Sequence, residues 1–116
     1  MKRTVLTLIV SLLVVTAPAG DAADLARGAA AFEARCAPCH APGREHPGTM
    51  QLELGRGMTN GALELRTDLA PQFVRLVVRR GLGLMPPFRP SELDDETLDA
   101  LAHYLSAGTD KEGTRP

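Results

Sequence analysis

The chain has 116 residues, with 13 lysines and arginines against 14 aspartates and glutamates. Its length allows at most one small domain, and the mildly acidic balance argues against a general nucleic-acid-binding protein. With three phenylalanines, one tyrosine and no tryptophan, the core lacks large aromatic side chains and is expected to need additional stabilisation.

Residues 1–23 have the order of a secretory signal peptide: two basic residues, an apolar run over 5–15, and then small residues around Ala19. The run is shorter than the roughly 18 residues that span a bilayer as a helix. We expect cleavage after Ala19 or, alternatively, after Ala22 or Ala23. The protein is then expected to be periplasmic, with no stable membrane insertion. An uncleaved anchor is the rival interpretation.

The mature domain, expected over 24–107, begins with a predicted helix. Asp24 is suited to cap it, and Leu25, Phe32 and Cys36 lie on one helical face. Pro38 is expected to end this helix, because proline lacks the backbone N–H that a helix interior requires.

The stretch Cys36-Ala37-Pro38-Cys39-His40 carries the clearest chemistry in the chain. At this spacing two thiols can bond to the vinyl groups of one haem while the imidazole reaches its iron. A buried porphyrin would also supply the apolar bulk that the core lacks. Two alternatives are a zinc site, completed by His46 or His103, and a thiol redox switch, which would need a strand-rich context.

Glycines and prolines punctuate residues 41–66, so this segment is expected to be loop-rich. Such a long loop is unusual in a compact domain, but reasonable if it wraps a prosthetic group. We interpret His46 as a solvated loop histidine, with a distal or proton-linked role as the alternative. His103 is expected on the surface of a later helix.

A second helix is predicted over 70–80, with Pro71 in its first turn and Gly81 after its end. An extended loop follows, and the last helix is expected to begin between Ser91 and Asp94. It should end at Gly108, before a polar tail over 108–116. Because the strand signal is weak throughout, the predicted fold class is all-α.

Three methionines, Met50, Met58 and Met85, are candidates for the second axial ligand of a haem iron. Met50 and Met58 are close to His40 in sequence, which makes it difficult for them to reach around the ring. Met85 lies 85 − 40 = 45 positions further on, in a loop stiffened by prolines. A thioether opposite an imidazole stabilises reduced iron and raises its potential.

Four arginines bracket the Met85 loop: Arg75, Arg79, Arg80 and Arg89. They would either form a positive patch that steers an acidic redox partner or be ordinary exposed charges at favourable helix ends. The sequence leaves both interpretations open.

These residues resemble those of the class I c-type cytochromes over most of the mature chain. Gly28 and Phe32 match the N-terminal helix of that family, and Leu101 and Tyr104 match the C-terminal helix that crosses it. Gly28 would be the notch at the crossing. The resemblance implies a small all-α cytochrome c fold, with loops wrapping one covalent haem.

The resemblance also implies which residues would hold the haem. Haem c would be bound covalently through Cys36 and Cys39, with His40 and Met85 as axial ligands of the iron. A backbone carbonyl, best matched at Pro47, would accept a hydrogen bond from the other ring nitrogen of His40. An arginine such as Arg44 or Arg66 would either lie near a haem propionate or be a solvated loop charge.

The segment 69–105 is also similar to the cytochrome subunits of flavocytochromes of the p-cresol methylhydroxylase and eugenol hydroxylase type, through Pro71–Gly81 and Met85–Phe88. This similarity implies a flavoprotein dehydrogenase partner that oxidises a 4-alkylphenol and holds FAD in its own subunit. The cytochrome would take single electrons from it and pass them to other redox proteins. Alternatives are a freely diffusing cytochrome that feeds a terminal oxidase, a haem enzyme or sensor, and a thiol-disulfide protein without haem.

Overall fold

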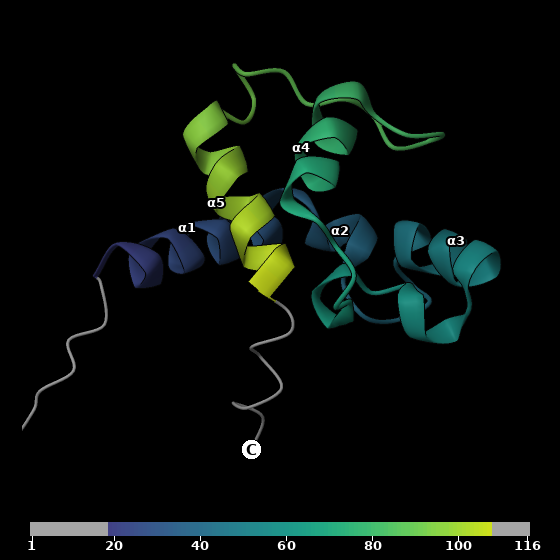
Figure 1. The fold of residues 1–116 in the computed structure, drawn as a ribbon. Coiled ribbons are helices and arrows are strands. Elements are labelled where there is room, and N and C mark those ends of the chain that lie inside the picture. The colour runs from purple at the N-terminus through teal and green to yellow at the C-terminus, as the bar shows by residue number, and fades with distance from the viewer. Residues whose placement is uncertain (1–18, 108–116) are drawn as a thin grey trace, which may run out of the picture.

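The computed structural model describes residues 19–107, which form an all-α fold (Figure 1). Within this range there is no strand, and the one isolated β-bridge pairs Leu82 with Met85. None of the described helices is long and apolar enough to cross a membrane. The apolar run at 5–15 and the tail at 108–116 lie outside the described residues. In chain order the elements are α1 (Ala19–Arg35), α2 (Ala37–His40), α3 (Pro47–Arg56), the 3-10 helices η1 (Met58–Asn60) and η2 (Leu63–Leu65), α4 (Pro71–Arg80) and α5 (Asp95–Ser106).

Helices α1 and α5 cross in close contact, as the resemblance to class I cytochromes implied (Figure 1). A Cβ atom added at Gly28 would meet the backbone carbonyl of Ala100 and would lie 2.6 Å from Cβ of Tyr104. Real Cβ atoms essentially never approach that closely. The prediction that Gly28 forms the notch at the crossing is therefore confirmed.

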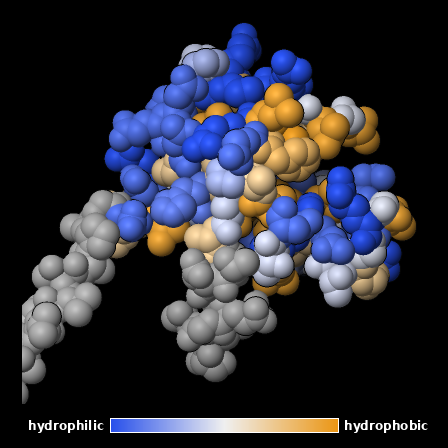
Figure 2. All heavy atoms as spheres, in the orientation of Figure 1, coloured by the Kyte–Doolittle hydropathy of each residue, from blue (hydrophilic) through white to orange (hydrophobic). Residues whose placement is uncertain are grey.

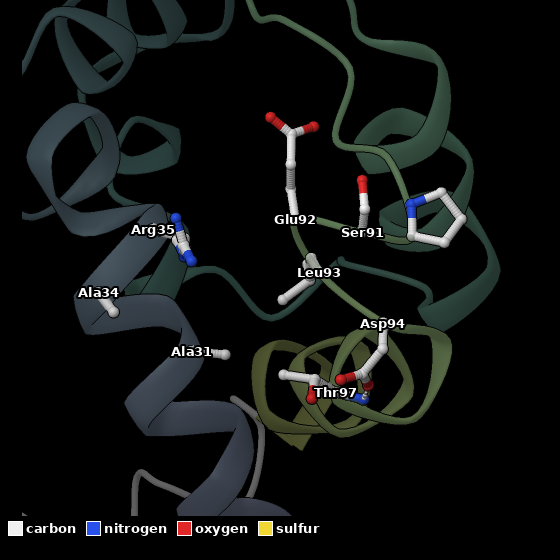
Figure 3. Close-up of a pocket in the computed structure, with 9 residues that line it drawn as sticks. Ala31, Ala34, Arg35, Ser91, Glu92, Leu93, Asp94 and Thr97 are labelled. Carbon is white, nitrogen blue, oxygen red and sulfur yellow. Dashed lines mark hydrogen bonds between the residues drawn. The ribbon is translucent and has the colours of Figure 1, made fainter.

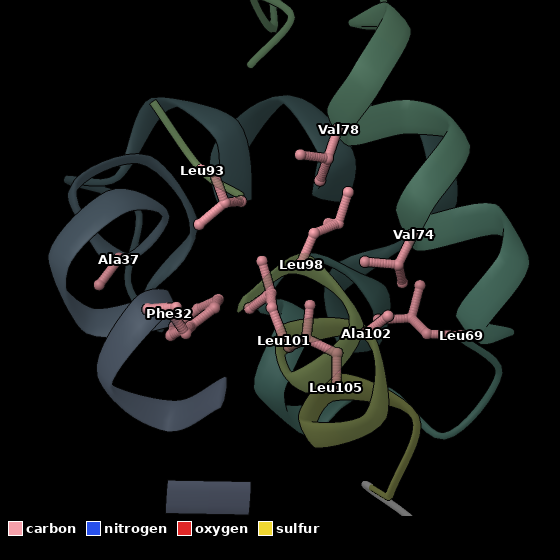
Figure 4. Packing of buried hydrophobic residues seen from close by; sticks show 11 residues of the cluster. Phe32, Ala37, Leu69, Val74, Val78, Leu93, Leu98, Leu101, Ala102 and Leu105 are labelled. Atoms are coloured by element: carbon pink, nitrogen blue, oxygen red, sulfur yellow. The ribbon is translucent and has the colours of Figure 1, made fainter. Parts of the chain in front are cut away.

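The core lies between α1, α4 and α5 (Figure 4). Phe32 from α1 and Leu101 from α5 are almost completely buried, and Val74 and Val78 supply the buried side of α4. The ring of Phe32 packs at a tilt against that of Tyr104, with centroids 6.2 Å apart. Thirteen of the hydrophobic residues that the structure describes are buried, five of them alanines, so this core is small.

The first helix begins earlier than predicted. It starts at Ala19 rather than Asp24, so Asp24 lies inside the helix instead of capping it. The reason is that Ala22 and Ala23 are strong helix formers, and Asp21 provides an acidic residue in the first turn, where the helix dipole favours negative charge.

The ends of the other two long helices follow the predicted signals. Pro71 is the first residue of α4, and Gly81 ends it with a φ of +72°, a conformation that residues with a side chain rarely adopt. Asp94 caps α5, its carboxylate accepting a hydrogen bond from the Thr97 amide at 2.7 Å. Helix α5 ends at Ser106, before the expected stop at 108.

The expectation that residues 41–66 are loop-rich is wrong in one part. Ten of them form α3, and two short 3-10 helices follow. Pro47 occupies the first helical turn, where its missing N–H has no partner to lose. Gly48 and Gly55 lie within this helix, so these two glycines do not mark the loop that their presence in the sequence predicted.

Candidate functional site

Cys36, Cys39 and His40 lie on a single helical turn. The amide of His40 donates to the Cys36 carbonyl at 2.8 Å, and the amide of Ala41 donates to the Ala37 carbonyl at 2.9 Å. Pro38 was predicted to end the first helix, but α1 already ends at Arg35. Pro38 instead lies in the first turn of α2, where a backbone N–H has no helical partner to lose. Two residues three positions apart on such a turn lie on the same side of it.

The two thiols are free, with Cys36 partly buried and Cys39 exposed. Burial, and secondly the neighbouring Cys39, raise the pKa of the Cys36 thiol to about 11. A redox-switch cysteine works as a thiolate and needs a lowered pKa. Within residues 19–107, moreover, no three His, Cys, Asp or Glu side chains are grouped so that they could hold a metal ion. The geometry therefore favours neither the thiol switch nor the zinc site.

The ring of His40 is held between its own turn and the first turn of α3. A Cβ atom at Gly48 would lie 2.7 Å from Cε1 and 2.9 Å from Nδ1 of His40, and 2.7 Å from the Cys39 carbonyl oxygen. Nδ1 is buried and has no hydrogen-bond partner, and burial lowers the pKa of His40. A buried neutral imidazole is the form in which histidine binds a metal.

The expected hydrogen bond from His40 to the Pro47 carbonyl is not formed. Pro47 is the first residue of α3, and the carbonyls of a helix point along its axis toward amides four residues further on. The contact at this place is instead the steric one made by Gly48.

Two further side chains attach α3 to the turn that carries Cys36, Cys39 and His40, and sequence reasoning predicted neither contact. Nδ1 of His46 donates to the Pro38 carbonyl at 3.1 Å, so His46 is a partly exposed loop residue, as predicted, but it is held to the turn by a hydrogen bond that was not expected. Thr49 is completely buried and donates its hydroxyl to the Ala41 carbonyl at 2.8 Å. Pro47 as a helix-starting residue was the one signal that could have pointed to this arrangement. His103 is exposed on α5, as predicted.

Met85 lies in the loop that joins α4 to the segment before α5, called here the Met85 loop (residues 81–88). Leu82 and Met85 exchange two backbone hydrogen bonds, of 3.1 and 3.0 Å. A Cβ atom at Gly81 would lie only 2.6 Å from the Met85 carbonyl oxygen, so a glycine is required for the loop to fold back. Met85 is partly buried against the core, whereas Met50 and Met58 are 38% and 69% exposed.

Large apolar side chains are exposed on the elements that surround this region. In Figure 2 apolar residues gather towards the centre and right of the view, where hydrophilic residues are interspersed with them, whereas the upper left is mostly hydrophilic. Within residues 21–107 the exposed large apolar side chains come from α3, η1, η2, α4 and the Met85 loop, and none comes from α1 or α5. They are Met50, Leu54, Met58, Leu65, Phe73, Leu76, Leu82 and Leu84.

An exposed apolar surface of this kind is typical of a site for an apolar group. Beside it the chain offers two free thiols and the imidazole of His40 on one turn. The residues present therefore fit a haem bound through thioether bonds.

The arginines do not form the suggested positive patch. Arg75 pairs with Asp99, Arg79 with Asp95, and Arg89 lies 3.6 Å from Glu92. These contacts neutralise the local charge, and they favour the interpretation of the arginines as ordinary charges at helix ends over that of a patch that steers a partner. Of the four, Arg80 alone has no such partner among the described residues.

Of the two arginines considered for a propionate, Arg66 is the buried one. It is 6% exposed and donates to both oxygens of Asp68, at 2.8 and 2.7 Å. This contact lowers the pKa of Asp68. Arg44 is exposed and lies 3.7 Å from Glu53.

A separate groove of about 220 Å³ lies between the C-terminal half of α1 and the segment that leads into α5 (Figure 3). Ala31 and Arg35 line one side of it, and Glu92, Leu93 and Thr97 line the other. It contains none of the cysteines, His40 or Met85, so it is not part of the site.

Comparisons with known proteins agree with this site. The family model described as cytochrome C oxidase, cbb3-type, subunit III matches residues 23–105. Cytochrome c6 of Thermosynechococcus vestitus is 31% identical over 102 residues, covering 88% of this chain and 87% of that protein. Cytochrome c6 of Cyanidioschyzon merolae is 34% identical over 93 residues, covering 78% and 80%.

No solved structure matches the chain significantly. The family match nevertheless covers most of the chain, and the cysteine and histidine spacing fits covalent haem c. The chain therefore belongs to the cytochrome c family and is an electron-transfer cytochrome that carries one covalent haem c.

Proposed function

We propose that the chain is an exported, single-haem electron carrier whose haem is bonded to Cys36 and Cys39 and whose iron is held by His40 and Met85. When bound, haem supplies one-electron chemistry through its iron. The observation that carries the proposal is the attachment turn, on which both thiols and the imidazole lie together and against which α3 is fixed. Export would follow from the signal-like residues 1–23.

The protein side chains do the positioning. Gly48 and the attachment turn restrict the ring of His40, and Gly81 lets the Met85 loop fold back toward the core. The exposed apolar side chains of α3 and α4 exclude water from a bound apolar group. A low-dielectric site with an imidazole and a thioether ligand favours the reduced iron.

An electron carrier differs from a haem enzyme in having both axial positions filled by the protein. A potentiometric titration of the purified holoprotein tests this role. We expect one reversible one-electron transition, and an added ligand such as cyanide should bind ferric iron only slowly and weakly. Rapid binding at micromolar cyanide would contradict the role of carrier and favour an enzyme or a sensor.

For the electron donor, we propose a flavoprotein dehydrogenase that acts on a 4-alkylphenol, with FAD in that partner subunit. The support is the similarity of Pro71–Gly81 and Met85–Phe88 to the cytochrome subunits of such complexes. The competing proposal is a freely diffusing carrier that feeds a terminal oxidase. Purification from the native periplasm at low salt separates them: a co-eluting flavin subunit supports the complex, and recovery of monomer alone supports the diffusing carrier.

A further inference from the structure

Arg79 contacts three segments that meet at the returning end of the Met85 loop. Its Nη1 donates to the Phe88 carbonyl at 3.1 Å, and its Nη2 donates to the Leu93 carbonyl at 2.9 Å and to the Asp95 carboxylate at 2.6 Å. The side chain is 23% exposed. One guanidinium thus joins α4 to the end of the loop, to the segment before α5 and to the first residue of α5.

The loop has few other attachments to α4 at this end. The Phe88 amide donates to the Val78 carbonyl at 2.8 Å, and the two residues before it are prolines, which have no amide to donate. Among the described residues, the hydrogen bonds that connect residues 86–88 to α4 are therefore the two at Phe88. Arg79 makes one of them.

We propose that Arg79 is a positioning residue for Met85: it clamps the returning end of the Met85 loop onto α4 and so keeps the methionine in place. This proposal rests on the proposed function, which takes Met85 as an iron ligand. A guanidinium suits the task because its donors lie on separate nitrogens of a rigid planar fork and can reach acceptors on different segments, whereas an ammonium group donates from a single nitrogen.

The adjacent Arg80 provides a matched comparison. It carries the same charge at the next position of α4, yet no ion pair or hydrogen bond joins its side chain to the described residues, and it is exposed. Replacing either arginine by glutamine changes the net charge equally. Only replacement of Arg79 removes the clamp.

The clamp has a measurable consequence in the holoprotein. If the Met85 loop opens more often, a small external ligand competes better for the iron, because its apparent affinity rises with the population of the open state. The Phe88 amide should also exchange with solvent faster, since local opening governs its protection. The second readout does not depend on which residue binds the iron.

The experiment compares Arg79→Gln with Arg80→Gln by imidazole binding and by hydrogen exchange at Phe88. We expect about a tenfold rise in both quantities for Arg79→Gln, the effect of losing a charge-assisted hydrogen bond, and less than twofold for Arg80→Gln. Arg79→Lys should resemble Arg79→Gln. Slow amide hydrogen exchange at Leu101, which is buried in the core, verifies that each variant is folded. If Arg79→Gln does not fold, Arg79→Lys takes its place in the comparison.

Equal responses of the Arg79 and Arg80 variants would overturn the proposal, and so would an Arg79→Lys protein that behaves as wild type. The methyl resonance of an iron-bound methionine, which the haem ring current shifts, tests the assignment of Met85 as a ligand separately from the role of Arg79. Its absence in the wild-type protein would contradict the ligand assignment, while the exchange rates at Phe88 would still decide whether Arg79 clamps the loop.

Discussion

Gly48 lies directly against the ring of His40, with so little space that a Cβ atom there would be 2.7 Å from Cε1. The same atom would also press on the Cys39 carbonyl oxygen. The α-helix that begins at Pro47 is therefore docked onto the haem-attachment turn at a position where no side chain fits.

Gly48→Ala should destabilise the protein by about 1–3 kcal/mol, because the added methyl overpacks a site bounded by backbone and by a restricted ring. Gly55→Ala in the same helix is the control. A Cβ atom at Gly55 meets nothing within 4 Å, so alanine should stabilise the helix by up to about 1 kcal/mol. Urea unfolding of both holoproteins measures the difference, and equal stabilities would contradict the contact between α3 and His40.

Gly28→Ala should separate α1 from α5, because the new methyl would meet the backbone carbonyl of Ala100, which cannot rotate away. We expect a loss of about 1–3 kcal/mol or more, seen as a lower thermal unfolding midpoint. Ala30→Gly, at an exposed position of α1, should cost about 1 kcal/mol through helix propensity alone. If Gly28→Ala proved no more harmful than Ala30→Gly, the crossing would not need a glycine.

Met85→Ala should remove the second axial ligand, lower the reduction potential and open the iron to external ligands. Met58→Ala is the matched control, because Met58 is 69% exposed in η1 and should leave the spectrum and potential nearly unchanged. The measurements are absorption spectra of both oxidation states and a redox titration. An unchanged low-spin spectrum in Met85→Ala would assign the ligand to another residue.

Tyr104 should make the stability depend on pH in the alkaline range. Burial, and then its hydrogen bond to Glu64, raise the pKa of Tyr104 to about 12, whereas an unfolded tyrosine titrates near about 10. Above pH of about 10 the unfolded chain releases a proton that the folded protein retains, so stability falls as the pH rises from about 10 to about 12.

Tyr104→Phe should lose this part of the pH dependence while retaining the packing against Phe32. Tyr104 is the only tyrosine in the chain, so its titration can be followed without interference from another phenol. Tyr104 titrating near about 10 in the folded protein would mean that neither burial nor Glu64 affects it. The measurement is the unfolding free energy of both proteins across this pH range.

The parts of the fold that could be predicted are those with local signals. Pro71, Gly81 and Asp94 mark the ends of α4 and α5 through effects that act within one turn. The pattern of Cys36, Cys39 and His40 is likewise local. Gly28 could be placed at the helix crossing because Gly28 and Phe32 resemble the N-terminal helix of the class I cytochromes.

Other features depended on contacts between distant segments, which sequence spacing does not contain. Gly48 reads as a turn residue, but it is a glycine because His40 packs against it. Thr49 looks like an ordinary polar residue in the sequence. In the structure it is completely buried, and its hydroxyl donates a hydrogen bond to the Ala41 carbonyl. Arg79 and Arg80 look equivalent in the sequence, and only the return of the chain at Phe88 and Asp95 distinguishes them.

The covalent attachment of haem tests the account most directly. Mass spectrometry of the denatured protein, with the pyridine haemochrome spectrum, reports whether haem is held by thioether bonds. We predict one haem per chain with two such bonds, and one bond in either Cys36→Ser or Cys39→Ser. A denatured wild-type chain without haem and with two titratable thiols, after maturation in its native periplasm, would contradict the account.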